Sequence, residues 1–336
     1  MDYTEIDREA VTAGTLFDGQ AGRRDALLAL LRALDALRYR FVTPTPATHA
    51  RVLARSSRRT ARDLRDALGW SLPFAPATLP TDILALLEAA GAVSSRGDDM
   101  LGCDVRVSSV DDVLFLHSAY PTLAQDAVFL GPDSYRFADL IVAKMGHLPD
   151  DARILDYAAG AGVGGVTAAR YARRAKLVLA DINPKASFLS SVNAEHAGLD
   201  HRVEHARSPN DVAGQFDLIV THPPFMMDDA KRAYRDGGDL YGARLSLDWV
   251  LEGVNKLASG GRLLLHTGVS IVDGHDVLRE EVHRQLRGER WSIDYHELDP
   301  DIFSEDLETP PYRHHDVERI AAVGLCVTRM SDAAAS

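Results

Sequence analysis

The chain has 336 residues, a length that allows one large domain or two domains with a core each. Its hydrophobic and charged fractions, 46% and 26%, exclude a fibrous or a disordered chain. The formal net charge of -12 repels polyanions at long range, so it disfavours a nucleic-acid partner unless a local basic patch overrides the total.

The first part of the chain, residues 1–128, alternates helical patterns with turns. Apolar residues at helical spacing predict four helices, over residues 25–39, 47–55, 60–68 and 81–90. We expect Thr60 to cap the third helix and Gly91 to end the fourth.

Two alternating segments follow, residues 104–110 and 112–117, and predict a hairpin that turns at Asp111. Helices followed by a hairpin are typical of a small winged-helix-like domain. We therefore expect residues 1–128 to form an accessory domain for substrate recognition.

An arginine series lies within this part. Its members are Arg51, Arg55, Arg58, Arg59, Arg62 and Arg65. On one unbroken helix these side chains would form a phosphate-binding stripe. However, Ser56, Ser57 and Thr60 favour a break in the helix, and Asp63 and Asp66 lie among the arginines. A solvated structural face is the favoured interpretation, and a nucleic-acid surface is the alternative.

From Ala152 onward, short apolar runs alternate with helical segments, which predicts an α/β fold with a doubly wound parallel sheet. The predicted strands are residues 153–156, 176–181, 216–221 and 261–267, with late strands at 291–298 and 319–328. We expect this second domain to cover residues 129–336.

A glycine-rich turn follows the first of these strands. Asp156 ends the strand, Gly160, Gly162 and Gly164 come before a helix, and Asp181 ends the next strand. Glycines let the backbone turn tightly and approach a ligand, and an acidic residue at this spacing reaches a pair of ribose hydroxyls. The order of these features predicts a nucleotide-like ligand, and helix packing alone is the alternative.

These residues resemble class I S-adenosylmethionine-dependent methyltransferases, and the resemblance covers roughly residues 128–328. It implies a Rossmann-like sheet of seven strands and S-adenosyl-L-methionine as cofactor. The resemblance places Asp156 and Ala158 at the start of the motif, and Ala158 stands where the family has its first glycine.

The resemblance also assigns cofactor contacts. Gly160 and Gly162 would line the methionine and ribose, Asp181 would hold the ribose hydroxyls, and Ile182 would lie beside the adenine. Where the family often has an acidic residue to bind the adenine amine, this chain offers Ser208 or Asn210.

Further cofactor contacts are expected at the edges of the site. Phe129 and Tyr135 would cover the methionine end, although a linker with Asp133 and Ser134 as helix caps explains the same segment. Thr221, at the end of its strand, is also expected at the cofactor.

The segment His222-Pro223-Pro224-Phe225 follows that strand directly. It resembles the Asn-Pro-Pro-Tyr or Asn-Pro-Pro-Phe motif of the small-domain N-methyltransferases, in which acceptors hold the hydrogens of a poorly nucleophilic nitrogen and the ring packs on the substrate. By this resemblance all four residues are catalytic. His222 departs from the motif, and imidazole can accept a hydrogen bond or take the proton. Histidine in a diverged, inactive protein is the alternative.

An acidic loop comes next. Asp228, Asp229, Tyr234, Arg235 and Asp236 are the predicted substrate-binding residues. Carboxylates beside the transfer site would attract a cation, whereas a solvated loop explains them equally. The acidic segment of residues 299–311 is expected to close over the site.

No metal site is predicted, because Cys103 and Cys326 are isolated and His314 and His315 lack other ligands nearby. The acidic first segment differs from a secretory signal, and no apolar run has membrane-spanning length, so a cytoplasmic protein without a membrane partner is predicted.

The leading hypothesis is an N-methyltransferase acting on a small amino-acid-like substrate, such as an arginine-type guanidine. The first alternative is methylation of an exocyclic base amine in RNA or DNA, or of a protein glutamine side chain. A non-catalytic binding protein with the same fold is the third hypothesis.

Overall fold

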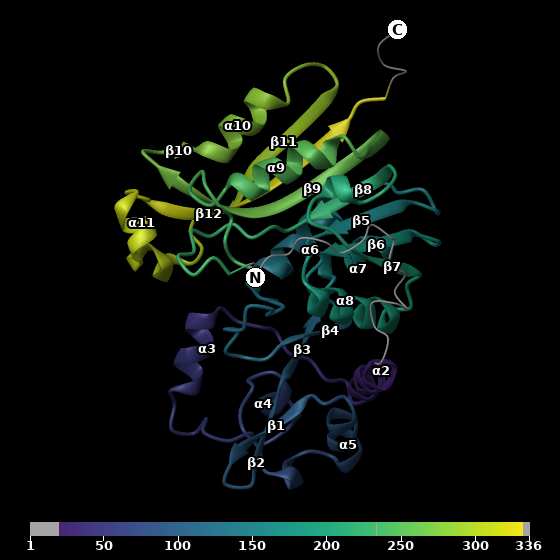
Figure 1. Ribbon diagram of the computed structural model, residues 1–336, viewed down its shortest axis with the longest axis vertical. Coiled ribbons are helices and arrows are strands. Elements are labelled where there is room, and N and C mark those ends of the chain that lie inside the picture. The colour runs from purple at the N-terminus through teal and green to yellow at the C-terminus, as the bar shows by residue number, and fades with distance from the viewer. Residues whose placement is uncertain (1–19, 233, 332–336) are drawn as a thin grey trace, which may run out of the picture.

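The structure, a computed structural model, describes residues 20–232 and 234–331. The N-terminal elements lie at one end of the long axis, and a large twisted sheet with its helices lies at the other (Figure 1). The acidic first segment lies outside the described residues. Among the residues described, none of the helices is both long and apolar enough to cross a membrane.

The four predicted N-terminal helices are confirmed. They are α2 (Ala21–Ala36), α3 (Pro46–Leu53), α4 (Leu64–Leu68) and α5 (Thr81–Ala89). Gly91 follows α5 with φ +55°, the left-handed conformation expected after a helix end. The predicted cap of α4 is wrong. Asp63, not Thr60, caps this helix by accepting a hydrogen bond from the backbone N–H of Asp66.

The arginine series does not lie on one helix, because α3 ends at Leu53, just after Arg51, and α4 begins only at Leu64, just before Arg65. Arg58 and Arg62 form ion pairs with Asp66, whose carboxylate is buried. The structural interpretation is therefore correct for these two arginines. Arg51, Arg55 and Arg59 are exposed.

Two hairpins follow. The predicted hairpin is confirmed as β3 (Val105–Val110) and β4 (Val113–Ser118), with Asp111 at φ +52° in its turn. The hairpin of β1 (Val93–Gly97) and β2 (Met100–Cys103) was not predicted, since serines and glycines break the apolar alternation there. The likeness to a winged helix stays a prediction.

The central sheet has the order β11-β12-β9-β8-β5-β6-β7, with β10 paired to β9. The strands are β5 (Arg153–Tyr157), β6 (Lys176–Asp181), β7 (His201–His205), β8 (Phe216–Thr221), β9 (Leu257–Val272), β10 (His275–Asp276), β11 (Trp291–Asp299) and β12 (Arg319–Arg329). From β9 to β7 all neighbours are parallel, and β12 pairs antiparallel with β9 and with β11. The seven strands of the main path confirm the expected Rossmann-like α/β fold; β7 was not predicted.

Helices cover both faces of the sheet. One face carries α6 (Pro132–Lys144), α7 (Val163–Ala169) and α8 (Pro184–His196), and the other carries α9 (Arg244–Val254) and α10 (Val277–Gln285). The strand residues alternate between the two cores, as in a sheet buried on both sides. The remaining elements are η1 (Pro76–Thr78), η2 (Pro209–Asp211), η3 (Ser304–Glu308) and α11 (Pro310–His314).

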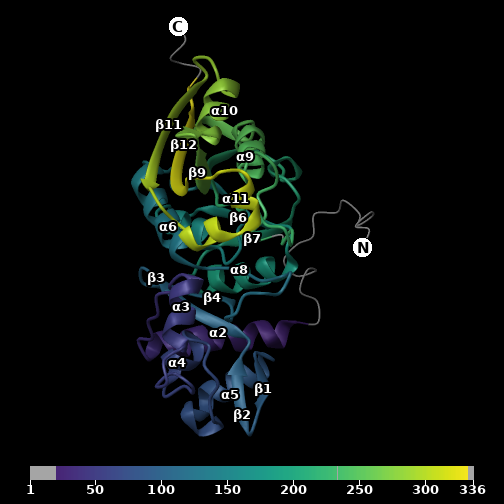
Figure 2. The same ribbon diagram turned by 90° about the vertical axis from the view of Figure 1, so that its left-hand side faces the viewer.

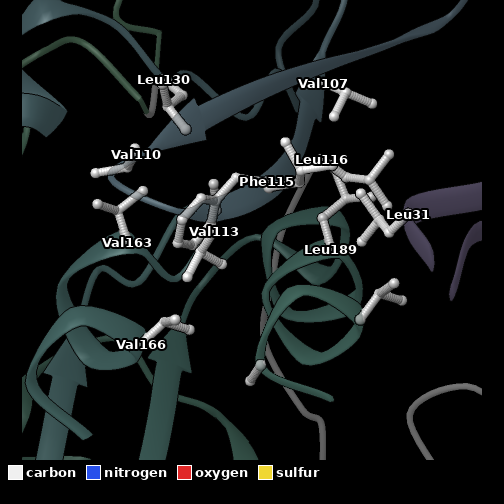
Figure 3. Packing of buried hydrophobic residues seen from close by; sticks show 14 of the residues in the cluster. Leu31, Val107, Val110, Val113, Phe115, Leu116, Leu130, Val163, Val166 and Leu189 are labelled. Atoms are coloured by element: carbon white, nitrogen blue, oxygen red, sulfur yellow. The ribbon is translucent and has the colours of Figure 1, made fainter. Parts of the chain in front are cut away.

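The N-terminal hairpin shares its core with the sheet domain. Phe115 and Val113 of β4 pack toward Val163 and Val166 of α7 (Figure 3). On the same side α2 lies next to α8 (Figure 2). Arg24 of α2 pairs there with Glu195 of α8. The two parts thus bury one continuous core, and the boundary at residues 128 and 129 stays a prediction.

Candidate active site

The sheet reverses its winding direction between β5 and β8, since β6 and β7 extend to one side of β5, and β8 and β9 to the other. In open α/β sheets, ligands bind in the crevice at the carboxyl ends of the strands at such a point. The glycine-rich turn follows β5 and the His-Pro-Pro-Phe segment follows β8. The topology therefore places both predicted motifs at the same edge.

Asp156 is a buried carboxylate at the end of β5. It accepts a hydrogen bond from the backbone N–H of Gly165 at 2.7 Å, which ties the strand to the first turn of α7. Burial raises the pKa of Asp156 to about 7, and the Gly165 hydrogen bond opposes this rise. This contact supports a structural role, in which Asp156 holds the glycine-rich turn between β5 and α7 in place.

The loop residues have left-handed backbone conformations, with φ +57° at Ala158, +53° at Gly160 and +81° at Gly162. Alanine at the first position keeps the conformation at a cost of roughly 1 kcal/mol relative to glycine. A Cβ on Gly160 would meet only one backbone oxygen, at 3.9 Å, whereas on Gly162 it would lie 3.1 Å from the Cβ of Ser190. A Cβ at position 162 would thus press on α8 and strain the left-handed backbone, while Gly160 has room around it.

Asp181 links the two loops of the predicted cofactor site. Its carboxylate accepts hydrogen bonds from the backbone N–H groups of Gly160 at 2.9 Å and Asn183 at 2.8 Å. Burial raises its pKa, and these hydrogen bonds oppose the shift. Ile182 beside it is 50% exposed, an apolar side chain available to pack on a flat ligand. The predicted ribose and adenine contacts lie next to one another.

The two candidates for the adenine amine lie in and beside η2. The Ser208 hydroxyl accepts a hydrogen bond from the backbone N–H of Asn210, so it serves as a helix cap. Asn210 is exposed, and its backbone oxygen accepts a hydrogen bond from Lys256. The exposed Asn210 amide is the better of the two candidates.

Three further predicted cofactor residues have structural contacts. The half-buried ring of Phe129 lies so close to Gly131 that a Cβ there would clash with it at 2.5 Å. The Tyr135 hydroxyl accepts a hydrogen bond from the backbone N–H of Thr43 at 2.9 Å. Thr221 is buried, and its hydroxyl donates to the Tyr157 carbonyl on β5 at 2.8 Å, so it fastens β8 to β5. A cofactor contact for each stays a prediction.

The His-Pro-Pro-Phe segment bends away from the sheet after Thr221. Pro223 is buried and Pro224 is half-buried, and neither can continue the hydrogen bonding of a strand. The Phe225 ring is 8% exposed and packs on Gly268, where a Cβ would lie 2.3 Å from it. This contact anchors the segment on β9, and a substrate contact of Phe225 stays a prediction.

His222 is half-buried, and its Nδ1 lies 2.9 Å from the backbone oxygen of His266. A carbonyl can only accept, so Nδ1 carries the hydrogen and Nε2 keeps the lone pair. Burial lowers the pKa of His222, and the buried carboxylate of Asp133 opposes this shift. His222 is thus a neutral acceptor near pH 7.

His266 and Asp133 were not predicted as site residues. His266 interrupts the apolar run of β9 as a fully buried polar side chain, and this interruption was the signal in the sequence. Asp133 was considered only as a helix cap, yet it is buried and paired with Arg136. Arg136 also pairs with Asp299, which connects the start of α6 to the end of β11.

The acidic loop was predicted to attract a cationic substrate. Most of its carboxylates are instead neutralised by arginine and lysine side chains of the same loop. Asp228 is buried and pairs with Arg232 and Arg235, and Arg235 also pairs with Asp306 in the segment of residues 299–311. The late segment therefore does contact the predicted substrate loop. Only a free carboxylate attracts a cationic substrate, so Asp228 is unsuited to that role.

The other loop residues differ in their partners. Asp236 pairs with Lys231, while Asp229 is exposed. The Tyr234 hydroxyl donates to the backbone oxygen of Thr122, at 2.7 Å, and so ties the loop to the segment after β4. A cavity of about 340 Å³ lies at this loop. It is lined by Met227, Asp228, Asp229, Lys231, Asp236, Gly238, Asp239, Leu240, Tyr241, Pro311 and His315.

Cys103 and Cys326 are free and buried. In the parts of the chain that the structure describes, no group of three or more potential ligands could hold a metal ion.

Comparison with known families decides the assignment of the sheet domain. Residues 136–282 match the model of the methyltransferase small domain. This segment is similar to the methyltransferase small domain. It includes β5, the glycine-rich turn, β8 and β9.

Two curated relatives support the match. A release factor glutamine methyltransferase of Koribacter versatilis is 29% identical over 169 residues, which are 44% of this chain and 60% of the relative. A ribosomal RNA small subunit methyltransferase C of Serratia proteamaculans is 33% identical over 73 residues, 22% of this chain and 21% of the relative. The chain thus spans less than two thirds of the relatives' length.

Among solved structures, the 16S rRNA methyltransferase RsmC of T. thermophilus, in complex with AdoMet and guanosine, has a TM-score of 0.42 at 14% identity. The alignment covers 77% of this chain and 64% of that one.

The match to the methyltransferase small domain confirms the expected class I S-adenosylmethionine-dependent family, and with it S-adenosylmethionine as cofactor. The functional equivalence of His-Pro-Pro-Phe and Asn-Pro-Pro-Phe stays a prediction, as do the individual site residues.

Proposed function

We propose that the chain is an S-adenosylmethionine-dependent N-methyltransferase that acts on a planar nitrogen, a base amine or a carboxamide, of a macromolecule. The observation that carries this proposal is the position of Nε2 of His222. It is an unprotonated acceptor at the strand end next to the glycine-rich turn.

The residues at the carboxyl ends of β5 and β6 fit the cofactor. Gly160 borders open space, Asp181 offers carboxylate oxygens next to it, and Ile182 is an exposed apolar surface for a base. When bound, the cofactor supplies an electrophilic methyl group on a sulfonium. The chain has to bind it and to orient the acceptor nitrogen in line with that methyl group.

The acceptor nitrogen is a weak nucleophile, because the lone pair of an amide or base amine is delocalised into its π-system. A hydrogen bond from this nitrogen to Nε2 of His222 would favour a pyramidal nitrogen, whose localised lone pair can point at the methyl group, and would prepare the loss of a proton. The bend at Pro223 and the anchored ring of Phe225 keep the backbone at this corner rigid. Positioning and proton acceptance are therefore the contributions expected of the chain.

An RNA base amine is the first candidate acceptor. Residues 20–68 contain eleven arginines and no lysine, against four aspartates and no glutamate, in a chain whose net charge is -12. Among the described residues, Arg51, Arg55 and Arg59 have no acidic partner, and they are exposed. This local basic surface offsets the overall repulsion of a phosphate backbone.

A protein glutamine is the second candidate, because the glutamine methyltransferase relative aligns over the longer segment, 169 residues against 73. A small arginine-type acceptor has lost its main support. It rested on His222, on the acidic loop and on the net charge, and the loop carboxylates of Asp228 and Asp236 are paired with cations of the same loop.

The test is methyl transfer from a radiolabelled donor to three acceptor pools: total RNA, a protein extract and small metabolites. We expect label in RNA that is lost on ribonuclease treatment, and a strong loss of label with His222→Ala at unchanged cofactor affinity. Label in protein would favour the glutamine candidate. Failure to bind S-adenosylmethionine in calorimetry would overturn the proposal.

A further inference from the structure

His222, directly after the carboxyl end of β8, and His266, within the neighbouring strand β9, form a close pair. Beyond the contact with the backbone oxygen of His266, Nδ1 of His222 lies 3.3 Å from Nδ1 of His266. The ring centroids are 4.7 Å apart, and the planes are almost perpendicular at 79°. The side chain and the backbone of His266 thus both face the same nitrogen of His222.

These contacts determine the neutral tautomer of both rings. Nδ1 of His222 carries its hydrogen, because it faces a carbonyl. Nδ1 of His266 faces that same hydrogen, so it must present a lone pair, since two N–H groups would repel one another. His266 therefore carries its hydrogen on Nε2.

The hydrogen on Nε2 of His266 has no partner. This nitrogen is buried, and within the described chain it forms no hydrogen bond. A buried donor without a partner costs stability, and an apolar side chain would fill the space without that cost. A histidine at this position therefore calls for a reason other than packing.

The charged groups around the pair explain which ring takes a proton. Asp133 and Arg136 of α6 and Asp299 of β11 lie on this side of the sheet, and Asp133 acts on His222. Burial lowers the pKa of His266 well below its ordinary value, and His222 and Arg136 lower it further. His266 thus stays neutral while His222 accepts the proton.

We propose that His266 is a positioning residue, which fixes His222 in the Nδ1–H form and keeps Nε2 free for the acceptor nitrogen. This inference rests on the proposed function. In the transfer step, the nitrogen bonds to the methyl carbon as the carbon–sulfur bond breaks. The proton of that nitrogen moves to Nε2 of His222. The imidazolium of His222 still donates its Nδ1 hydrogen to the backbone oxygen and to Nδ1 of His266.

Nitrogen NMR of the full chain tests the tautomers without any acceptor. The protein is labelled with ¹⁵N-histidine and saturated with S-adenosylhomocysteine, and the His222 signals are identified by their loss in His222→Ala. We expect a protonated Nδ1 and an unprotonated Nε2 for His222. An Nε2–H form of His222 would overturn the inference.

Two substitutions at position 266 separate positioning from packing. In His266→Asn the side-chain oxygen can replace Nδ1 as acceptor, whereas His266→Leu removes the acceptor at similar volume. His266→Leu keeps the backbone oxygen and removes the second acceptor of the Nδ1 hydrogen. We therefore expect it to populate the Nε2–H tautomer of His222 in part and to lower kcat by on the order of tenfold, at unchanged cofactor affinity. His266→Asn should restore the Nδ1–H form and most of the turnover.

The matched control is His283→Leu, which removes an exposed histidine of α10 and should leave the His222 signals unchanged. A His222 tautomer that is the same in His266→Leu as in the unaltered chain would refute the positioning role. By contrast, an absence of methyl transfer to every acceptor with the Nδ1–H form intact would count against the proposed function. The two failures are therefore distinguishable.

Discussion

The side-chain amide of Asn193 binds both backbone polar groups of Leu116. It accepts a hydrogen bond from the Leu116 N–H at 2.8 Å and donates one to the Leu116 carbonyl at 3.0 Å. The same amide nitrogen donates to the carbonyl of Ala161 in the glycine-rich turn, at 2.9 Å. One buried side chain on α8 thus joins the N-terminal hairpin to the predicted cofactor loop.

Asn193→Leu should lower the free energy of unfolding by about 2–4 kcal/mol, because it leaves three buried backbone groups without partners. We also expect weaker binding of S-adenosylmethionine, since Ala161 loses its support. Urea unfolding and calorimetry measure the two effects. The control is Asn255→Leu, in which an exposed asparagine loses a single hydrogen bond to Leu251. Equal unfolding midpoints for the two variants would contradict the bridging role.

Asp181→Ala should weaken S-adenosylmethionine binding by on the order of 10²-fold, about 2.7 kcal/mol, because the substitution removes the predicted ribose contact and the hydrogen bond to Gly160. Calorimetric titration of the folded protein is the measurement. Asp217→Ala is a suitable control. Its carboxylate also accepts a hydrogen bond from a backbone N–H, that of Arg153, but at the opposite edge of the sheet. Near-normal affinity in Asp181→Ala would show that the ribose assignment is wrong.

His222→Ala should leave cofactor affinity unchanged and lower turnover by on the order of 10²-fold or more, as expected for a positioned proton acceptor. His222→Asn distinguishes two roles, because asparagine can accept a hydrogen bond but cannot take a proton. Turnover that survives in His222→Asn supports hydrogen bonding alone. Full turnover in His222→Ala would leave the residue without a catalytic role.

The pH dependence of turnover follows from the same residue. The neutral form of His222 is the active form, so turnover is present above its pKa and is lost as the pH falls through that value. Burial lowers this pKa, and Asp133 opposes the shift, so the acidic limb of the pH–rate profile should lie below 6.5. Asp133→Asn should move the limb to lower pH. Movement to higher pH would contradict this assignment.

Sequence patterns were sufficient for the features that depend on local chemistry. The apolar strand runs, the glycines of the turn and the prolines after Thr221 each restrict the backbone locally, and the structure has these elements where they were predicted. The partners of side chains depend on tertiary contacts instead. The sequence therefore indicated loop carboxylates that are free to bind a cationic substrate, whereas in the structure Arg232 and Arg235 neutralise Asp228.

The residues missed at the site have the same explanation. His266 lies 44 positions from His222 along the chain, and they meet only because β8 and β9 are neighbours in the sheet. Asn193 lies 77 positions from Leu116 and looks like an ordinary helix residue. Neither pairing has a local spacing that could reveal it.

The exposed arginines of the N-terminal part give a test of the RNA candidate. Arg51, Arg55 and Arg59 are free of acidic partners in the residues that the structure describes, so each can bind a phosphate. Replacing all three by alanine should weaken RNA binding and reduce the slope of log affinity against log salt by about 2 to 3, from the release of roughly one counterion per contact. Fluorescence anisotropy with a labelled RNA hairpin over a salt series is the measurement.

The control replaces three exposed arginines of the sheet domain, Arg173, Arg174 and Arg287. These residues lie outside the N-terminal part, so their removal changes the net charge equally without touching the proposed surface. If both triple variants weaken RNA binding to the same extent, the contact is a general charge effect and the N-terminal surface has no special role. A loss confined to Arg51, Arg55 and Arg59 would favour RNA over a protein acceptor, because a phosphate backbone gives the steep salt dependence that a carboxamide substrate lacks.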